Sequence, residues 1–293
     1  MWEQFAKRQQ RIEKAYVPRV KAAISKEIGK VVAHIKRNGL TGYQSFIHHA
    51  INAEDVFKIL KDLYKTAAIQ EANITYKELR AKHYKLRTFG YNEAWSNVID
   101  THLGNLKLLE TCQNISETTK ERILQVIAKG LREGLGFEEI ARQIESDEIP
   151  LQRARLIVRT ESIGAMNIGS MMGAISTGIQ YQKRWVTAKD HRVRGTKPTD
   201  RFSHLALSGD TVEMVKSFNN GEAIRYPGDK NASPGNFCNC RCTMQYIAKR
   251  DSSGSIMLYP NVPEKPAPGK EMSNLLISLI GGVLFGDSIS DLF

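Results

Sequence analysis

Apolar residues recur at helical spacing through the first third of the chain. In the segment 2–36 they form a single stripe made of Ile24, Ile28, Val31, Val32 and Ile35. A basic face with Lys26, Lys30 and Arg37 lies opposite this stripe. Similar spacing continues over 53–86 and 91–109. Because one apolar face and one polar face are typical of amphipathic helices, we predict an elongated, basic helical region over residues 1–113; a plain helical bundle is the alternative.

Further helices are predicted in the middle of the chain. Ser116 is a suitable N-cap for an amphipathic helix, and a short helix over 137–144 follows a glycine turn. A long helix over 152–177 carries Gly169 and Gly173 on one face. Glycine costs about 1 kcal/mol relative to alanine inside a helix. We therefore predict that another backbone packs closely against this face.

Strand-like alternation appears only after this long helix. The pattern predicts strands over 181–188, 211–214, 222–226 and 237–247. Because successive residues of a strand point to opposite faces, the last strand would place the three sulfurs of Cys238, Cys240 and Cys242 on one face. Helices followed by mixed strands indicate an α+β fold, with a compact domain over 114–250.

The C-terminal residues differ in composition from the rest of the chain. Residues 251–270 are rich in Ser, Pro and Gly and read as a linker. Residues 271–293 form an apolar tail, which we expect to bury against a partner; folding back onto its own domain is the alternative. The N-terminus lacks the layout of a signal peptide, and no apolar run reaches the ~20 residues that cross a bilayer. No membrane partner is expected.

The charge of the chain points to a polyanionic partner. Forty-two Lys and Arg residues against 31 Asp and Glu residues give a formal net charge of +11, with a pI near 9.4. A strongly basic balance favours association with nucleic acid; a merely basic soluble protein is the alternative. Hydrophobic residues make up 41% of the chain, which predicts a packed core.

Three of the four cysteines stand at alternate positions between residues 238 and 242. Thiolates, imidazole and carboxylate are the usual zinc ligands, and structural sites fill four positions. This predicts a structural zinc site made of Asp190, His204, Cys240 and Cys242. Cys238 could replace Asp190, but three alternate cysteines in a straight strand span ~13 Å. The alternative is that the cysteines are small buried residues and His204 is hydrogen-bonded in the core.

A buried polar network is also predicted, which would fix the long helix against the strands. Its expected members are Arg155, Arg159, Thr160, Glu161, Asn167, Trp185, Asn239 and Arg241, with Asp190 beside the last of these.

Two enzymatic alternatives start from some of the same residues. An ADP-ribosyltransferase would use Glu213 or Glu222 as its catalytic acid. A metal-dependent nuclease would use Asp190, His191 and His204. The sequence lacks the paired-glutamate spacing of the first class and a distinct general base for the second, so we predict no catalytic residues.

An ordered set of short motifs resembles the phage Mu F-like head morphogenesis family, the minor head proteins of tailed phages. The set runs from Arg155-Leu156-Ile157-Val158-Arg159-Thr160-Glu161 with Asn167, through Lys183-Arg184-Trp185-Val186, Asp190-His191-Arg192-Val193-Arg194, Ser203-His204, Leu207 and Gly209, to Tyr226-Pro227-Gly228-Asp229 and Asn239-Cys240-Arg241-Cys242. The resemblance covers roughly residues 116–247. Cys238 departs from it, since the family usually has an apolar residue there.

The resemblance implies a non-enzymatic minor head protein that acts at the portal vertex during capsid assembly, with a role in DNA packaging or ejection. Its expected partners are the portal protein, a capsid or scaffold protein, and packaged double-stranded DNA that is bound without sequence preference. The expected location is the interior of the capsid near the portal, after assembly in the host cytoplasm. Basic residues of the N-terminal helices are expected to contact DNA or the portal.

Overall fold

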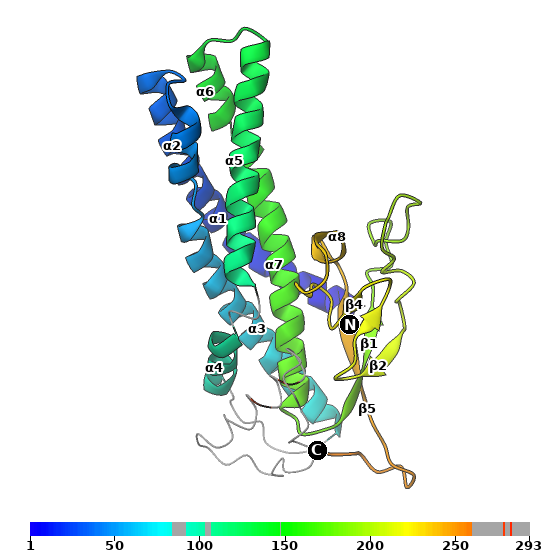
Figure 1. Ribbon diagram of the computed structural model, residues 1–293. Coiled ribbons are helices and arrows are strands. Elements are labelled where there is room, and N and C mark those ends of the chain that lie inside the picture. The colour runs from blue at the N-terminus through cyan, green and yellow to red at the C-terminus, as the bar shows by residue number, and fades with distance from the viewer. Residues whose placement is uncertain (84–91, 103–106, 147, 260–277, 279–281, 283–293) are drawn as a thin grey trace. The chain divides into compact units, whose positions relative to one another are not determined.

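The computed structural model describes residues 1–83, 92–102, 107–146 and 148–259, together with the single positions 278 and 282. The chain is mainly helical up to residue 175, and a small region with strands follows (Figure 1). This confirms the predicted α+β fold. The predicted linker 251–270 is described as far as residue 259, and isolated bridges tie Ile256 to Arg250 and Leu258 to Ile179. Residues 260–270 and, apart from the two single positions, the apolar tail 271–293 lie outside the described residues.

The helices before the sheet are long and amphipathic. Their bounds are α1 Trp2–Asn38, α2 Tyr43–Ala50, α3 Glu54–His83, α4 Asn92–His102, α5 Leu108–Arg132, α6 Phe137–Glu145 and α7 Glu148–Ile175. The predicted stripe of α1 is buried, as the exposed fractions of Ile24, Ile28 and Val31 show, none above 2%. Apolar periodicity therefore identified the helices and the faces that they bury.

The start of α5 differs from the prediction. The helix begins at Leu108, so Ser116 lies inside it and is not its N-cap. The Ser116 hydroxyl instead donates to the carbonyl oxygen of Ile51 at 2.7 Å. A tertiary hydrogen bond, which local sequence does not reveal, explains why a polar residue occupies this buried position.

The strands form two small antiparallel sheets. Strands β1 Tyr181–Val186, β2 Thr211–Glu213 and β5 Thr243–Ala248 make one sheet in the order β2-β1-β5, and β3 Phe218–Asn219 pairs with β4 Ala223–Ile224. In β1 alternate residues are buried, with Tyr181, Lys183 and Trp185 on the inner face. Trp185 pairs with Met244 of β5, and this register brings the residues that precede β5 near the end of β1.

The predicted strand over 237–247 is only partly correct. Residues Pro234–Phe237 form a short helix, α8, and β5 begins at Thr243. Between them Asn239 has a positive φ of 54°. Because the three cysteines lie in this turn and not in a strand, their side chains do not follow strand alternation.

Packing contacts divide the chain into two compact units, each built from separated segments. Unit 1 contains Met1–Ile12, Leu63–Leu106 and Arg159–Phe293, and unit 2 contains Glu13–Asp62 and Lys107–Val158. Helices α1, α3 and α7 contribute to both. The sequence-based ranges 1–113 and 114–250 do not coincide with these units and stay a prediction.

Unit 1 contains a close helix pair. A Cβ added to Gly169 or Gly173 of α7 would come within 3.0 Å of the backbone of Ala68 or Ala72 of α3. Real Cβ atoms essentially never come this close to backbone atoms. The predicted close approach at this glycine face is therefore confirmed, and its partner is α3.

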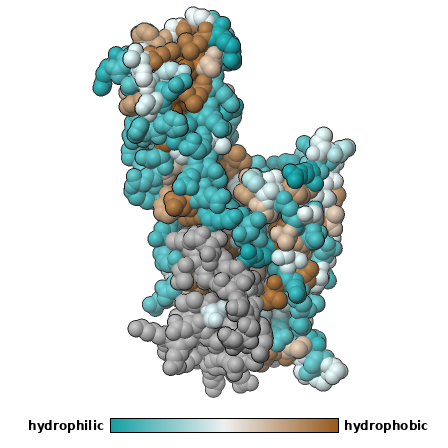
Figure 2. Space-filling view, viewed as in Figure 1, coloured by the Kyte–Doolittle hydropathy of each residue, from teal (hydrophilic) through white to brown (hydrophobic). Residues whose placement is uncertain are grey.

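Unit 2 is a helical bundle with an apolar end. Figure 2 shows apolar surface where α2, α5 and α6 meet. Leu131 of α5 and Phe137 of α6 are 52% and 42% exposed. No helix among the described residues combines the length and apolar character that a membrane span requires.

Candidate metal centre

Two loops of unit 1 bring the candidate ligands together. His204 lies between β1 and β2, where its backbone N–H donates to the carbonyl oxygen of Arg194 at 3.0 Å. Cys240 and Cys242 lie in the turn between α8 and β5, and the Cys240 N–H donates to the carbonyl oxygen of Phe237 at 3.2 Å. All three side chains are buried, with exposed fractions of 1 to 2%.

The distances within this group suit a zinc ion. Nδ1 of His204 lies 3.6 Å from Sγ of Cys240 and 3.6 Å from Sγ of Cys242, and all three ligand atoms lie within 4.8 Å of one another. Tetrahedral zinc, with Zn–S of about 2.3 Å and Zn–N of about 2.0 to 2.1 Å, separates sulfur and nitrogen ligands by about 3.6 Å. Two thiolates and one imidazole are also a donor set that zinc prefers.

The second nitrogen of His204 has a partner that fixes the state of the ring. Nε2 lies 2.7 Å from Oδ1 of Asn236. Because an amide oxygen only accepts, Nε2 carries a proton, and Nδ1 is the ring nitrogen that faces the sulfurs. Asn236 itself donates to Glu222 at 3.1 Å and exchanges hydrogen bonds with Asn220. Such an outer partner is typical of a metal-binding histidine.

Electrostatics separate the two thiols. Burial opposes ionisation of Cys240, but hydrogen bonds with Cys242 and His204 outweigh it and hold the pKa of Cys240 well below its usual range. Burial, and then the neighbouring Cys240 thiolate, raise the pKa of Cys242 well above its usual range. The Cys240 thiolate is therefore stable beside His204. Ionisation of Cys242 as well would require a cation between the two sulfurs.

Trp185 closes one side of the group. Its ring meets the His204 ring edge to face, with centroids 5.3 Å apart, and meets Phe218 in the same way at 5.1 Å. Trp185 is 1% exposed. These aromatic contacts exclude water from the cluster and hold the imidazole in place.

Asp190 does not join the cluster that the structure forms. Its Oδ2 accepts a hydrogen bond from Nη1 of Arg241 at 2.5 Å, and its Oδ1 accepts one from the N–H of Arg192 at 3.0 Å. Among the described residues, His204, Cys240 and Cys242 are the His, Cys, Asp and Glu side chains that meet closely enough to share an ion. The group thus offers three ligand atoms, and a tetrahedral zinc ion would take its fourth ligand from outside this group.

Cys238 also stays outside the cluster. Burial raises the pKa of its thiol, and its charged neighbours are Lys230, Glu161 and Arg194. Its carbonyl oxygen accepts a hydrogen bond from the Arg194 guanidinium. The sequence suggested Cys238 as a substitute for Asp190, and the structure does not bring it to the other two thiols.

Part of the predicted polar network surrounds the cysteine turn. The Asn239 N–H donates to Oγ1 of Thr160 at 3.1 Å. Nδ2 of Asn167 donates to the carbonyl oxygen of Cys242 at 3.2 Å, and Oδ1 of Asn167 accepts from Oγ1 of Thr243 at 3.1 Å. These hydrogen bonds attach the turn to α7.

Other predicted members of the network lie apart from the turn. Glu161 binds Nζ of Lys230 at 2.5 Å and accepts from Oη of Tyr64 at 3.0 Å. Arg155 is exposed on the part of α7 that belongs to unit 2, and Arg159 is half-buried. The predicted network is therefore two separate groups. Thr160 and Asn167 fix the cysteine turn, and Glu161 forms a buried ion pair with Lys230.

Three buried polar residues of unit 1 escaped the sequence analysis. Asn236 has no motif of its own, and only the fold places it beside His204. Lys230 is paired with Glu161, 69 residues away in sequence. Lys183 could have been found, because strand alternation places it on the same face as Trp185; it is fully buried and donates to the carbonyl oxygen of Arg225 at 2.7 Å.

The residues of the enzymatic alternatives, Glu213, Glu222 and His191, lie in separate environments. Glu213 accepts hydrogen bonds from Gln182 and Lys249 at 3.0 and 3.1 Å. Glu222 accepts one from the Ser233 N–H at 2.9 Å, besides that from Asn236. His191 is exposed on its loop. The structure does not join these side chains into one site.

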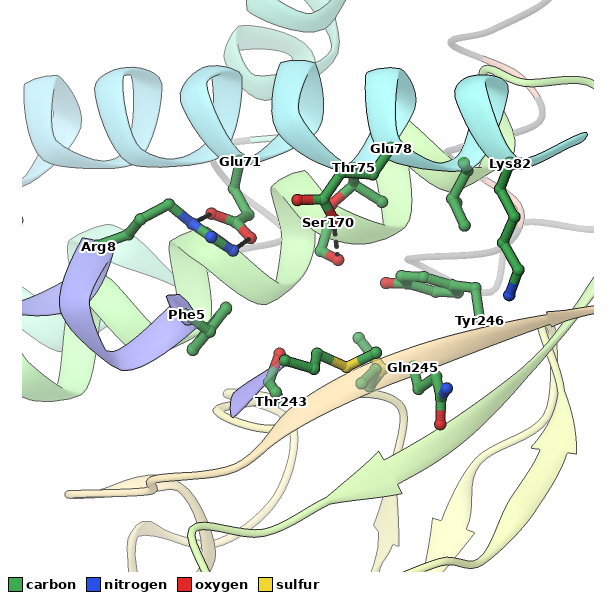
Figure 3. A pocket seen from close by; sticks show the side chains of 13 residues that line it. Phe5, Arg8, Glu71, Thr75, Glu78, Lys82, Ser170, Thr243, Gln245 and Tyr246 are labelled. Carbon is green, nitrogen blue, oxygen red and sulfur yellow. Dashed lines mark hydrogen bonds and ion pairs between the residues drawn. The ribbon is translucent and has the colours of Figure 1, made fainter. Parts of the chain in front are cut away.

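A separate cavity of about 180 Å³ lies in unit 1, beside α1, α3, α7 and β5 (Figure 3). At one end the Arg8 guanidinium binds Glu71 through two hydrogen bonds of 2.6 and 2.8 Å. Ser170 and Thr75 are hydrogen-bonded to each other at 3.2 Å, and Tyr246 projects from β5 toward them. None of the metal-site ligands lines this cavity.

Comparison with known proteins gives one match. Residues 121–245 match the family described as Phage Mu protein F like protein. No curated protein and no solved structure gives a significant match to the chain. The matched segment contains α6 and α7, strands β1 to β4, the first half of β5, and all three ligands of the candidate metal centre. The resemblance drawn from the motifs is thereby confirmed: residues 121–245 of this chain match the Mu F-like phage head morphogenesis family.

Proposed function

We propose that the chain is a minor head protein of a tailed phage, that it acts at the portal vertex during capsid assembly, and that it contacts packaged DNA. The family match over residues 121–245 is the observation that carries this proposal. The net charge of +11 supports a location beside a polyanion. We propose the interior of the capsid as its location and an architectural role in place of a catalytic one.

The apolar end of unit 2 supports a protein partner. Exposed Leu131 and Phe137 lie among charged residues of α5 and α6. Clustered apolar side chains with a polar rim are typical of protein interfaces. We propose that the portal or another capsid component covers this surface.

Co-purification tests this role. The tagged chain, expressed with the phage's portal and capsid proteins, is expected to retain the portal and to be found in purified particles. Leu131→Gln with Phe137→Gln should weaken this association at least tenfold. The matched control, Leu205→Gln with Val215→Gln, changes two apolar side chains of unit 1 that are 42% and 41% exposed. Absence of the chain from particles would contradict the proposal.

We also propose that His204, Cys240 and Cys242 hold a structural zinc ion. The ion would join the loop after β1 to the turn before β5 and would balance the second thiolate. The first of these loops buries Val193, Phe202 and Leu207, and metal binding would add to the folding free energy that this burial supplies. The observation that carries this proposal is the pair of 3.6 Å separations between nitrogen and sulfur.

Elemental analysis of the purified full chain tests the metal. We expect about one zinc per chain, lost in Cys240→Ser and in Cys242→Ser. Cys238→Ser is the matched control and should keep the zinc, because its thiol lies outside the cluster. A strong chelator should lower the melting temperature of the wild type and of Cys238→Ser, but not that of the other two variants. Full zinc in Cys240→Ser, or none in zinc-supplemented wild type, would refute the site.

A further inference from the structure

The loop after β1 carries a dense group of exposed cations. Between residues 189 and 201 the exposed cations are Lys189, Arg192, Lys197 and Arg201, with the exposed ring of His191 among them. Figure 1 shows this loop in yellow-green, beside β1 and β2. The group belongs entirely to unit 1.

The two carboxylates of the loop are already engaged by its own surroundings. Oδ2 of Asp200 accepts hydrogen bonds from the N–H groups of Gly195 and Lys197 at 2.8 and 3.1 Å, and these lower the pKa of Asp200. Asp190 is held by Arg241. Arg192 approaches Asp190 only at 3.9 Å and keeps 60% of its side chain exposed. The outward charge of the loop is therefore positive.

The loop is also held in a defined conformation. The guanidinium of Arg194 donates to the carbonyl oxygens of Asn236 and Cys238, and the carbonyl oxygen of Arg194 accepts from the N–H groups of His204 and Leu205. Val193 is buried below it, 3% exposed. A surface whose cations project from a fixed backbone loses less entropy on binding than a mobile tail does.

The composition of the loop favours phosphate over protein as its partner. Between 189 and 201 its one strongly apolar side chain, Val193, is buried, so the loop offers no exposed apolar anchor. Protein interfaces depend on buried aromatic and apolar anchors. Phosphate groups require only Lys, Arg, hydroxyl and backbone N–H donors, and Thr199 is exposed beside the cations.

We propose that the loop 189–201 is a binding surface for the phosphate backbone of double-stranded DNA, and that it contacts the duplex without reading its sequence. This inference deepens the proposed function, because it places the DNA contact on unit 1 beside the metal centre and not on the N-terminal helices. The hydrogen bonds of Arg194 then make the cysteine turn the support of the DNA-binding loop.

The test measures binding of the full chain to a random-sequence duplex over a range of salt concentrations. Arg192→Ala, Lys197→Ala and Arg201→Ala are combined in one variant. Each lost phosphate contact makes the negative slope of log K against log salt shallower by about 0.9. We therefore expect the magnitude of the slope to decrease by about 2 to 3 in this variant. The affinity at low salt should fall at least tenfold.

The matched control removes three exposed cations from α1 by combining Lys14→Ala, Lys30→Ala and Arg37→Ala. It changes the net charge by the same amount as the loop variant. Its slope of log K against log salt should stay close to that of the wild type. Both variants should keep the melting temperature and zinc content of the wild type. Equal losses in the two variants, or an unchanged slope in the loop variant, would overturn the inference.

Two further outcomes separate this inference from the proposed function. If the wild type enters particles but binds no duplex, the loop inference fails while the head role stands. If the loop variant keeps DNA binding but loses the portal, the loop is a site for an acidic protein surface, and the DNA assignment is wrong. Failure to enter particles would instead refute the proposed function itself.

Discussion

The indole Nε1 of Trp2 donates a hydrogen bond to the carbonyl oxygen of Arg241 at 2.9 Å, across 239 residues of sequence. The Arg241 guanidinium also lies 5.6 Å from the centre of the Trp2 ring, and it binds Asp190. The start of α1 is thus attached to the residue between the two cysteines of the candidate metal centre. Residues Met1–Ile12, which make this attachment, belong to unit 1.

Trp2→Phe should destabilise the protein by about 1 kcal/mol, because it removes one hydrogen bond and keeps an aromatic ring over Arg241. Trp2→Ala should cost more, about 2 to 3 kcal/mol, since the ring is lost as well. Urea unfolding measures both changes. Equal stability of Trp2→Ala and the wild type would show that the attachment contributes nothing.

Gly169→Ala and Gly173→Ala should each destabilise the protein by at least 2 kcal/mol, because the new Cβ would collide with the backbone of α3. Gly29→Ala in α1 is the control. Its Cβ would meet no atom within 4 Å, so helix propensity should stabilise the protein by about 0.5 to 1 kcal/mol. Thermal unfolding of the three variants should show opposite signs, and stabilisation of Gly169→Ala would contradict the close packing of α3 and α7.

Lys230→Met should destabilise the protein by roughly 3 to 5 kcal/mol, because it leaves the buried carboxylate of Glu161 without its cation. The side chains of Lys230 and Glu161 are 5% and 3% exposed, so water replaces little of the lost interaction. The double variant Glu161→Leu with Lys230→Met should recover a large part of that stability. A double-mutant cycle by denaturant unfolding gives the coupling, and strictly additive losses would argue against the ion pair.

The stability of the wild type should depend on pH through Lys183. Burial lowers the pKa of Lys183 to about 7, with Asp229 acting in the opposite direction. Unfolded Lys titrates near 10.4, so between pH 7 and 10 the unfolded state binds more protons than the folded state. The free energy of unfolding therefore rises with pH in this window through this group. Below pH 7 both states are protonated, and the penalty of burying the charge is present in full.

Replacing Lys183 by Met should remove this dependence. The difference in stability between Lys183→Met and the wild type should be most favourable to the variant near pH 6 and should shrink toward pH 9.5, by an amount on the order of 4 kcal/mol. Comparing the two proteins cancels the titration of cysteines and tyrosines that they share. Denaturant unfolding at pH 6, 7.5 and 9.5 measures the difference, and parallel pH profiles would contradict a buried, neutralised lysine.

Local pattern was enough to predict the helices and one of their contacts. The apolar spacing of Ile24, Ile28 and Val31 identified a buried helical face, since a helix repeats every 3.6 residues whatever its neighbours are. Gly169 and Gly173 indicated a close backbone approach because glycine is otherwise unfavourable there. The sequence did not name α3 as the partner, since pairing between helices depends on contacts far apart in the chain.

The candidate site depended less on local pattern and more on tertiary contacts. His204, Cys240 and Cys242 were recognised by ligand chemistry, but the sequence grouped Asp190 with them, and the structure binds that carboxylate to Arg241. The alternation expected for the cysteines failed because α8 and the positive φ of Asn239 form a turn before β5. Propensity over five residues does not reveal such a turn when its hydrogen bonds run to Thr160 and Asn167.

The amino-acid sequence alone therefore determined the helical and strand-bearing parts, the basic character and the resemblance of the middle of the chain to the Mu F-like family, because these depend on composition, periodicity and ordered motifs. Only the tertiary structure decided which side chains share a site and that Asn236 orients His204. It also decided that the basic loop 189–201 is hydrogen-bonded to the cysteine turn through Arg194. The physical reason is that these relationships join residues tens to hundreds of positions apart. Burial and hydrogen-bond geometry select such contacts only when the chain has folded.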